Sequence, residues 1–518
     1  MKLDIEKWNM PLYKAAKEYG LSSPVAFHMP GHKLGRGLPD DFTGNIASID
    51  LTEIRGTDNL HNPEGVIKEA QELAACAFGA DRTFFIVNGS TCGVQAAIMT
   101  ICKPGDKLIV GRDSHRSAVG GLMLAKACPW YIKTEFLGSF GIPLPVTPEE
   151  VERALDECPD AAGVFITSPN YYGICADIDK IACVVHKRGK ALIVDEAHGA
   201  HLRFHRAMPS CAMDSGADIC VQSAHKTLPA FTQGAYLHVR SGRVDIEKLA
   251  FILSVIETSS PSYVIMSSLD YARAFMENSG KEALEELLQK IYLFREAFHD
   301  NKYYRILDEK ILLNSNLNKE SINFKKENCI LQLSEAQQIN NVLQEGSMFQ
   351  AKKLHDPTRL VINTSLLGMT GFEADSILSS SYGINVEMAD YSNIVCITTV
   401  ADRDSDFERL AAALKDISRN NRALEPVKPI GIGSLKIPPH VLKPEEIMSA
   451  DGMTIELSKA AGMISKGMIT PYPPGIPAVC PGEIILQETI EYIYNILNAG
   501  GKVTGLHENT RVSVVKYG

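Results

Sequence analysis

Short apolar runs alternate with amphipathic helical stretches through the first half of the chain, and this rhythm constrains the fold more than any other feature. Helices are expected near 65–78 and from residues 90 and 114 onward. The apolar runs are Thr83–Val87, Lys107–Val110, Gly163–Ile166, Ala191–Val194, Asp218–Val221 and Ala235–Val239. Such short apolar runs are typical of strands that are covered on both faces. The alternation therefore predicts a large α/β domain around a mostly parallel sheet.

The length and the later pattern indicate how the chain divides. At roughly 100–200 residues per domain, 518 residues hold more than one structural unit. We predict an N-terminal arm over 1–60, a large domain over 61–300, a connecting insertion over 301–355 and a smaller C-terminal α/β domain over 356–518. Apolar residues among charges in the arm favour an amphipathic helix that packs on another surface. They are Ile5, Trp8, Met10, Leu12 and Tyr13.

Further elements are expected beyond the large sheet. Lys281–His299 carries its apolar residues on one broad side and predicts a helix, and Asp402 is placed to cap another helix. Strands are predicted at Cys329–Leu333, Arg359–Thr364, Ile384–Met388 and Ile394–Thr399. Five prolines within 471–483 exclude a helix and a central strand, so a rigid loop is expected before a helix from Ile484. The stretch 311–350 matches no motif.

Composition excludes several classes of protein. A net charge of −10 without a long Lys/Arg run argues against a nucleic-acid partner, so a small molecule is expected. The 12 cysteines include no Cys-x-x-C pair, which argues against a zinc ribbon or a disulfide framework and predicts no metal site. No stretch has the length and apolarity of a signal peptide or a membrane span. We therefore expect a soluble, cytoplasmic protein.

Two chemically matched residues follow neighbouring strands of the predicted sheet. Asp195 ends the run in IVDEAHGAH (193–201), and Lys226 follows the next strand in QSAHKTLPAFTQG (222–234). A lysine in a dry pocket can lose its proton and react with an aldehyde, and a carboxylate can keep an aromatic nitrogen protonated. Those are the two demands of pyridoxal 5′-phosphate. Taken separately, each residue also has a purely structural interpretation: Asp195 as a strand end or a helix cap, and Lys226 as a solvated lysine before a turn.

Other polar residues suit the rest of that cofactor. Asn88-Gly89-Ser90-Thr91 offers a glycine turn, two hydroxyls and the N–H groups of a helix start to a phosphate, and Ser223 and His225 can add donors. His115 can stack on the pyridine ring. Glycine–serine turns are common, and a lone histidine such as His115, His28 or His32 is more often structural. All four main sites nevertheless fall at the carboxyl ends of strands, where α/β sheets bind ligands.

Six segments together resemble one family, the ornithine/lysine/arginine decarboxylases, which use pyridoxal phosphate on the aspartate-aminotransferase scaffold. They are FHMPGHKLG (27–35), DLTEIRGTDNLHNPEGVIKEAQ (50–71), FFIVNGSTCG (84–93), VDEAHGAH (194–201), SAHKTLPAFTQG (223–234) and PPGIPAVCPGE (473–483). The resemblance covers nearly the whole chain and is closest to the short bacterial branch, which lacks an N-terminal response-regulator-like domain. Ala224 departs from the hydroxyl that many members carry.

The resemblance implies a role for each site residue. Lys226 is the expected Schiff-base lysine, Asp195 the partner of the pyridine nitrogen and His115 the stacking residue. The expected cofactor-binding set is completed by Ser90, Thr91, Ala197, His198, Ser223 and His225. In ETSSPSY (257–263), Ser259 or Ser260 is expected to reach the cofactor phosphate of a neighbouring subunit. A homodimer, or an assembly of dimers with shared active sites, is implied.

The expected reaction is the decarboxylation of a basic L-amino acid. Arginine, giving agmatine for polyamine synthesis, is the first choice, followed by lysine giving cadaverine and ornithine giving putrescine. His225 or Lys226 is expected to protonate Cα, and Glu483 to receive the cationic end of the substrate, with Asp451 as a weaker candidate. Glu483 reads alternatively as a helix N-terminal charge. Two alternatives remain: transamination, elimination or cyclisation on the same cofactor, or a catalytically silent regulatory relative.

Overall fold

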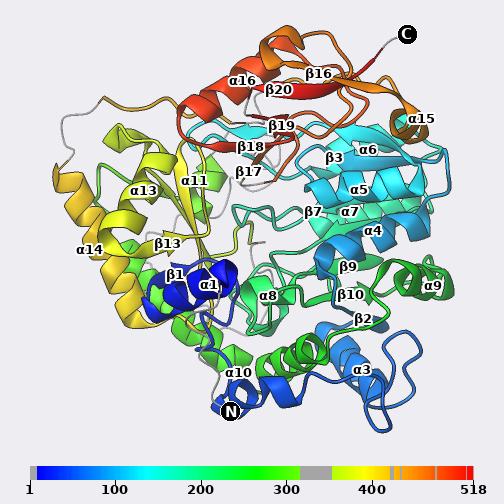
Figure 1. Ribbon diagram of the computed structural model, residues 1–518, viewed down its shortest axis with the longest axis horizontal. Coiled ribbons are helices and arrows are strands. Elements are labelled where there is room, and N and C mark those ends of the chain that lie inside the picture. The colour runs from blue at the N-terminus through cyan, green and yellow to red at the C-terminus, as the bar shows by residue number, and fades with distance from the viewer. Residues whose placement is uncertain are drawn as a thin grey trace, which may run out of the picture.

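A large sheet forms the centre of the molecule in the computed structural model, which describes residues 9–314, 353–420, 425–431, 435–472, 475–508 and 510–516 (Figure 1). The described strands of this sheet lie in the order β2-β10-β9-β8-β7-β3-β4. Their bounds are β2 Arg82–Ile86, β3 Lys107–Gly111, β4 Cys128–Ile132, β7 Gly163–Thr167, β8 Ala191–Asp195, β9 Ile219–Gln222 and β10 Ala235–Val239. Neighbours from β9 to β4 pair in parallel, whereas β10 is antiparallel to both β2 and β9.

The six predicted strands of this sheet and its α/β class are confirmed. The sequence missed β4, because its half-exposed residues CPWYI at the sheet edge lack a continuous apolar run. Helices cover both faces of the sheet: α3 Val66–Phe78, α4 Gly89–Ile101, α5 Arg116–Ala125, α6 Pro148–Glu157, α7 Ile178–Lys187 and α9 Ile246–Ile256. Within β8, Ile193 packs in one hydrophobic cluster and Leu192 and Val194 in another, as a strand buried on both faces requires.

A long helix, α10 (Tyr263–Glu296), leads to a second sheet. This sheet has the order β11 (Arg305–Ile306), β12 (Arg359–Asn363), β15 (Asn393–Ile397) and β14 (Met388–Ala389), with α13 (Gly371–Tyr382) and α14 (Asp404–Asn420). The helix predicted over Lys281–His299 overlaps the second half of α10. Ser262 caps the start of α10, because its side chain accepts a hydrogen bond from the Ile265 N–H. Asn278, Ser279 and Gly280 interrupt the apolar pattern, so the sequence pattern did not predict the first half of α10.

Asp402 does not cap α14, so that prediction is wrong. The helix begins at Asp404, and the Asp402 carboxylate instead accepts from the Thr399 N–H at 2.7 Å. It also lies 3.7 Å from the Lys33 Nζ. The carboxylate of Asp402 therefore contacts the N-terminal part of the chain. No local sequence pattern indicates this contact.

The predicted arm contains α1 (Pro11–Leu21) and β1 (Val25–Phe27). None of the residues of α1, all of which the structure describes, is buried, and Leu12 is 83% exposed. The contacts of α1 within the chain include Tyr19, whose hydroxyl lies 2.6 Å from Nε2 of His28 and accepts from Nδ2 of Asn385. Ile5 and Trp8 lie outside the described residues, so packing of the arm through its apolar residues stays a prediction. In contrast, β1 is fully buried and pairs in parallel with β13 (Ile384–Val386).

The last hundred residues have a hydrophobic cluster of their own, which includes Leu457, Val479 and Ile493. Their elements are α15 Pro444–Ser449, β16 Gly452–Glu456, β17 Thr470–Tyr472, α16 Gln487–Asn498, β18 Lys502–Thr504, β19 Leu506–His507 and β20 Arg511–Val515. Pro471 lies in β17, which pairs only with β18 among the described strands. The strand predicted at Cys329–Leu333 lies outside the described residues, and the proposed domain boundaries stay predictions.

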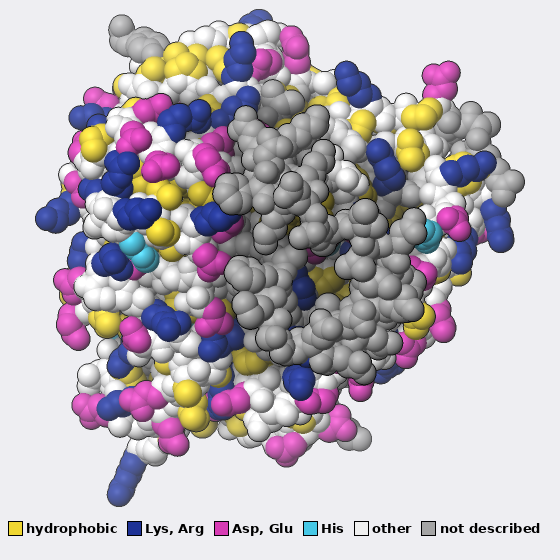
Figure 2. Space-filling model, turned by 180° about the vertical axis from the view of Figure 1, so that it is seen from behind, with side chains coloured by type: hydrophobic (Ala, Val, Ile, Leu, Met, Phe, Trp, Pro, Cys, Tyr) yellow, Lys and Arg dark blue, Asp and Glu magenta, His cyan; other side chains and the backbone are white. Residues whose placement is uncertain are grey.

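The surface view adds to the charge argument. On the face shown in Figure 2, acidic and basic side chains are interspersed, and neither sign gathers into a broad patch. In the part of the chain that the structure describes, every helix is too short or too polar to cross a lipid bilayer.

Candidate active site

A cavity of about 270 Å³ opens where the carboxyl ends of β8 and β9 face the turns after β2 and β3. It is lined by Met29, Gly89, Ser90, Thr91, Asp113, His115, Ser117, Thr167, Tyr171, Asp195, Ala197, His198, Ser223, His225, Lys226, Thr232, Gln233, Tyr472 and Ile476. The structure therefore brings together the predicted residues of the large domain, Ser259 and Ser260 excepted. The ends of the strands and the turns that follow them carry titratable side chains of the cavity, such as Asp195 and Lys226. Segments from both ends of the chain, with Met29 and Ile476, complete its lining.

Lys226 lies in the short helix α8 (Ala224–Thr227), directly after β9. Its Nζ is 3.0 Å from Nε2 of His198, whose Nδ1 is 3.1 Å from Nη2 of Arg359. A guanidinium can only donate, so Nδ1 of His198 must accept, and Nε2 of the neutral ring carries the hydrogen. His198 then donates to the nitrogen of Lys226, which can accept only as a neutral amine. Arg359 thus fixes the tautomer that favours a neutral lysine.

The pKa shifts agree with this arrangement. Burial lowers the pKa of Lys226, although the nearby charge of Asp195 opposes the shift. Burial also lowers the pKa of His198 well below its usual value, and the charges of Lys226 and Arg359 act in the same direction. Both shifts favour the neutral forms of the two side chains, in agreement with the contact between their nitrogens.

Asp195 is the last residue of β8 and is buried beside the lysine. Its Oδ1 accepts from the N–H of Ala197 at 3.1 Å. Burial raises the pKa of Asp195, while the charge of Lys226 opposes that change. A carboxylate in such a dry site gains most from a cationic partner, such as a protonated ring nitrogen.

A turn at the other end of the cavity is shaped for an anion. Gly89 adopts a φ of +78°, and no heavy atom lies within 4 Å of the position that a Cβ would take. It opens α4, so the first N–H groups of that helix have no acceptor within the helix. The Oγ of Ser223 donates to the Oγ of Ser90 at 2.6 Å, which places two hydroxyls at the same point.

Two histidines complete the predicted set. His115 caps α5, since its Nδ1 accepts from the N–H of Ser117. Burial lowers the pKa of His115 to about 3, with further contributions from Lys226 and Arg116. His225 contacts the carbonyl oxygen of Gly234 through Nδ1 at 3.0 Å, and burial lowers its pKa to about 4. Both rings are therefore neutral at physiological pH.

The residues present fit an anionic aromatic aldehyde. A neutral amine, a buried carboxylate and an open helix start share one cavity. The Oδ1 and Oδ2 of Asp113 and the Oγ1 of Thr167 are buried there without a hydrogen-bond partner among the described residues. Orphaned polar atoms in a cavity indicate a polar occupant.

Some predicted residues lie elsewhere. Ser259 and Ser260 are exposed on the surface, and Asp451 is exposed as well. Glu483 is fully buried and is not among the described residues that line the cavity; its Oε2 lies 3.1 Å from Nη2 of Arg112. Its assignment to the substrate therefore stays a prediction, and it lies before the start of α16, which begins at Gln487.

The sequence also missed residues that contact the predicted ones. Tyr171 lies with its ring 4.6 Å from that of His198, and its hydroxyl donates to Oε1 of Glu387 at 2.5 Å. Oε2 of the same glutamate accepts from the N–H of Met29. The position of Tyr171, shortly after the predicted strand Gly163–Ile166, was the available signal. Glu387, between β13 and β14, and Arg359, at the start of β12, are distant in sequence.

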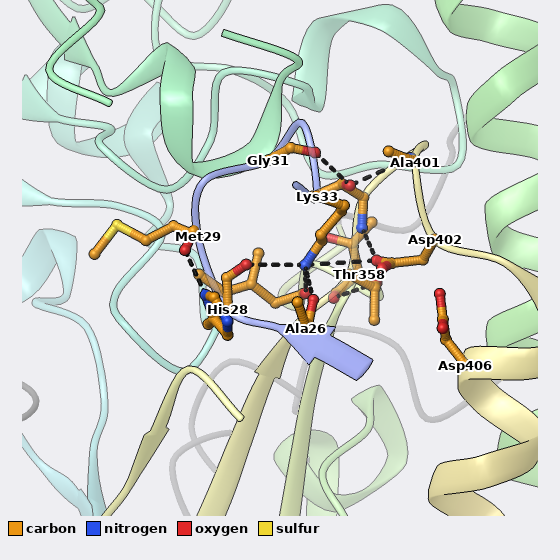
Figure 3. A network of polar contacts seen from close by, with 12 residues as sticks. Ala26, His28, Met29, Gly31, Lys33, Thr358, Ala401, Asp402 and Asp406 are labelled. Atoms are coloured by element: carbon orange, nitrogen blue, oxygen red, sulfur yellow. Dashed lines mark hydrogen bonds and ion pairs between the residues drawn. The ribbon is translucent and has the colours of Figure 1, made fainter. Parts of the chain in front are cut away.

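The segment around Met29 is held by a buried lysine (Figure 3). Lys33 is 1% exposed, and its Nζ donates to the carbonyl oxygens of Ala26, His28 and Ile397. Figure 3 shows its side chain directed between β1 and Asp402. The N–H of Gly31 donates to the carbonyl oxygen of His225 at 2.7 Å, which joins this segment to the turn of Lys226.

The fold and the site define an α/β enzyme in which a lysine lines a cavity at the carboxyl edge of the sheet. Comparison with known proteins supports this class. The models of the Orn/Lys/Arg decarboxylase major domain and C-terminal domain match residues 10–406 and 438–514. The chain therefore belongs to the Orn/Lys/Arg decarboxylase family, and it is a decarboxylase, that is, a carboxy-lyase.

Individual relatives agree with the family. The chain is 36% identical over 511 residues to an arginine decarboxylase of Bacillus subtilis (strain 168), covering 96% of each chain. It is 34% identical over 512 residues to an arginine decarboxylase of Bacillus anthracis, covering 98% of this chain and 97% of the relative. The structure of lysine decarboxylase A from Pseudomonas aeruginosa superposes with a TM-score of 0.72 at 20% identity, covering 98% of this chain and 80% of that one. This last likeness concerns the fold.

Proposed function

We propose that the protein binds pyridoxal 5′-phosphate in the cavity around Lys226 and decarboxylates a basic L-amino acid. Arginine, giving agmatine and CO2, is the first candidate, before lysine giving cadaverine and ornithine giving putrescine. The observation that carries the proposal is the meeting of Lys226, Asp195 and the open turn at Gly89 in one cavity. The two Bacillus relatives named arginine decarboxylase support the order of substrates.

Each residue has a distinct task in this proposal. Ser90, Thr91, Ser223 and the first N–H groups of α4 hold the phosphate, and Asp195 holds a proton on the ring nitrogen. His115 would stack on the ring, and Lys226 would supply the amine that attaches the cofactor. When bound, pyridoxal phosphate accepts the electron pair that is left when CO2 departs.

The proton that replaces CO2 on the substrate Cα needs a donor at the cavity. Lys226 is the better of the two predicted donors, because its amine can take up a proton from the α-ammonium group of the incoming substrate and would then give that proton to Cα. Its Nζ lies 3.0 Å from Nε2 of His198 in the cavity wall. Nδ1 of His225 is engaged by the carbonyl oxygen of Gly234, so only its Nε2 is available. Water must be kept from the site, and Met29, Tyr472 and Ile476 provide cover from outside the large sheet.

We further propose that the protein works in the cytoplasm, in polyamine synthesis, as a homodimer or an assembly of dimers. Ser259 and Ser260 follow α9 directly and are exposed, so they are free to reach the cofactor phosphate of a second subunit. Titration of apo-protein with pyridoxal phosphate tests this, because replacing both serines by alanine should weaken cofactor affinity without changing the fold.

The deciding experiment gives the purified protein pyridoxal phosphate and, separately, carboxyl-labelled arginine, lysine and ornithine. Stoichiometric release of labelled CO2 with agmatine would establish the arginine reaction, and CO2 with cadaverine or putrescine would reassign the substrate. Asp195→Asn should cut turnover strongly and cofactor affinity less, because it removes the charge but keeps the shape. A cofactor absorbance band without CO2 from any of the three amino acids would contradict the proposal and indicate another reaction or a silent relative.

A further inference from the structure

Residues 475–483, here called the C-terminal loop, cross from the last part of the chain to the active site. The loop contributes Ile476 to the cavity. Its Gly475 meets the turn after β3, where the N–H of Arg116 donates to the Gly475 carbonyl oxygen at 3.2 Å. The loop is thus in direct contact with the turn that carries His115.

A single arginine anchors this loop. Arg112 follows β3 directly, and its Nη1 donates to the carbonyl oxygen of Pro477 at 2.6 Å. Its Nη2 donates to the carbonyl oxygen of Ala478 at 3.3 Å and to Oε2 of Glu483 at 3.1 Å. The same Oε2 accepts from the Cys480 N–H at 2.6 Å, so the carboxylate folds the loop onto itself as well as onto Arg112.

The pair is buried, which makes it a strong constraint. The side chain of Glu483 is 0% exposed and that of Arg112 is 12% exposed. The guanidinium also lies over the ring of Tyr131, 5.0 Å from its centroid. Removing one partner of such a pair leaves a charge in a dry environment, so the anchored arrangement is favoured over an open one.

The loop that Arg112 anchors contacts His115, which lies three residues after Arg112 in the chain. Gly475 has a φ of +84°, and a Cβ there would lie 3.1 Å from Cδ2 and 3.3 Å from Nε2 of the imidazole. The loop backbone therefore covers one edge of the ring, while Ser117 engages Nδ1 at the opposite edge. The imidazole is held between its own helix and the C-terminal loop.

We propose that Arg112 and Glu483 are positioning residues, whose buried pair presses the C-terminal loop against His115 and so fixes the ring that stacks on the cofactor. The anchoring of the loop stands on the contacts above, whereas the stacking task of His115 rests on the proposed function. Glu483 thereby acts through another residue, and not on the substrate.

Chemical modification of His115 tests the anchor without any need for activity. Purified protein carrying pyridoxal phosphate is treated with diethyl pyrocarbonate, which acylates accessible neutral imidazoles, and His115 is followed by peptide mass spectrometry. Exposed His299 serves as the internal reference. We expect Glu483→Gln to raise the modification rate of His115 about tenfold or more, because the loop opens more often without the ion pair. The visible circular dichroism of the bound cofactor should change with it.

Two further variants keep the test decisive. Arg112→Lys preserves the buried charge, and therefore the fold, but loses the fork that binds three groups at once; it should raise the rate by about threefold. Asp160→Asn removes the exposed pair of Asp160 with Lys107, at the start of the same strand β3, and should leave His115 unchanged. If Glu483→Gln does not fold, Arg112→Lys decides.

The outcomes separate the two proposals. The anchor would be overturned, even in an active decarboxylase, if His115 were modified at the wild-type rate in both variants. If Glu483→Gln does not fold, a wild-type rate in Arg112→Lys would overturn it. Absence of decarboxylation by the wild-type protein would overturn the proposed function, while a raised modification rate in the variants would still establish the anchor.

Discussion

The floor and the walls of the active-site cavity are built in different ways. The floor consists of the carboxyl end of β8, which carries Asp195, and of the turns after β2, β3 and β9, which carry Ser90, His115 and Lys226. The walls include Met29 and Ile476, which come from opposite ends of the chain. Floor residues are placed by the sheet itself and by neighbours such as Ala197, two residues from Asp195. The walls are held by ion pairs between residues that are about 370 positions apart.

This difference indicates a division of labour. The floor holds the groups to which we assign the chemistry, so we expect damage to it to appear in turnover. The walls are fixed by buried pairs, Lys33 with Asp402 and Arg112 with Glu483, which cost desolvation but define one arrangement. Damage to the walls should appear first in stability and in the packing of the site.

The largest effect is expected on the floor, from Lys226→Ala. The variant should lower kcat by on the order of 10³-fold or more, because it removes both the attaching amine and the proton donor. Carbon dioxide release under saturating substrate measures the loss. Lys180→Ala is the matched control, since that side chain is 70% exposed on α7. Retention of wild-type turnover by Lys226→Ala would end the proposed role of this lysine.

Breaking the N-terminal wall should come next. Lys33→Met removes the fully buried cation beside Asp402 and leaves Arg36, which is partly exposed and 3.6 Å away, as the cation next to that carboxylate. Such losses cost up to about 3–5 kcal/mol of stability. Calorimetry should therefore show a lower thermal midpoint for at least one transition. Lys68→Met, which removes an exposed lysine 4.0 Å from Glu72 on α3, should change the midpoint little. Equal midpoints for the two variants would show that the wall does not depend on its buried pair.

The same contrast separates what the sequence predicts from what it conceals. All six predicted strands of the large sheet appear within two residues of their expected ends, because each is an apolar run buried on both faces. The floor follows from them, since Asp195 ends β8 and Ser90, His115 and Lys226 each lie four residues after the end of a strand. Their meeting in one cavity was therefore predictable from local pattern and topology together.

The walls depend on contacts that no local pattern reveals. Glu483 was assigned to the substrate by resemblance to the family, and nothing nearby in sequence indicates its partner Arg112. Asp402 was assigned as a helix cap because it precedes an amphipathic stretch, and nothing nearby in sequence indicates its ion pair with Lys33. Arg359, which fixes the tautomer of His198, begins a correctly predicted strand, but the strand pattern says nothing about the direction of its side chain.

Glu257 offers a pH-dependent test of the floor. Its Oε1 accepts from the N–H of Val87, just before the turn at Gly89, and burial raises its pKa from 4.5 to about 7. A carboxyl whose pKa is raised in the folded state contributes stability that is complete below pH 4.5 and is lost as the pH rises through about 7. This pKa shift corresponds to a loss of at most about 3 kcal/mol in the free energy of unfolding as the pH rises.

The comparison is made with Glu257→Gln, which cannot ionise. Between pH 5 and pH 8 the wild-type protein should lose more stability than this variant, because only the wild type must bury a charge. Thermal midpoints across that range measure the difference. Glu247→Gln, at the exposed start of the same helix α9, should follow the wild-type profile. Parallel profiles for wild type and Glu257→Gln would contradict the prediction.

The smallest effect is expected where floor and wall meet, at Tyr171. Tyr171→Phe keeps the ring against His198 but removes the hydrogen bond to Glu387, whose other oxygen holds the N–H of Met29. The loss should be about 1 kcal/mol, seen as a several-fold fall in kcat/KM. Tyr172→Phe is closely matched, because the neighbouring hydroxyl donates to Asp390 at 2.8 Å and Tyr172 is not among the described residues that line the cavity. It should lose comparable stability but keep kcat/KM, so an equal fall in both variants would mean that the bond serves the fold and not the site.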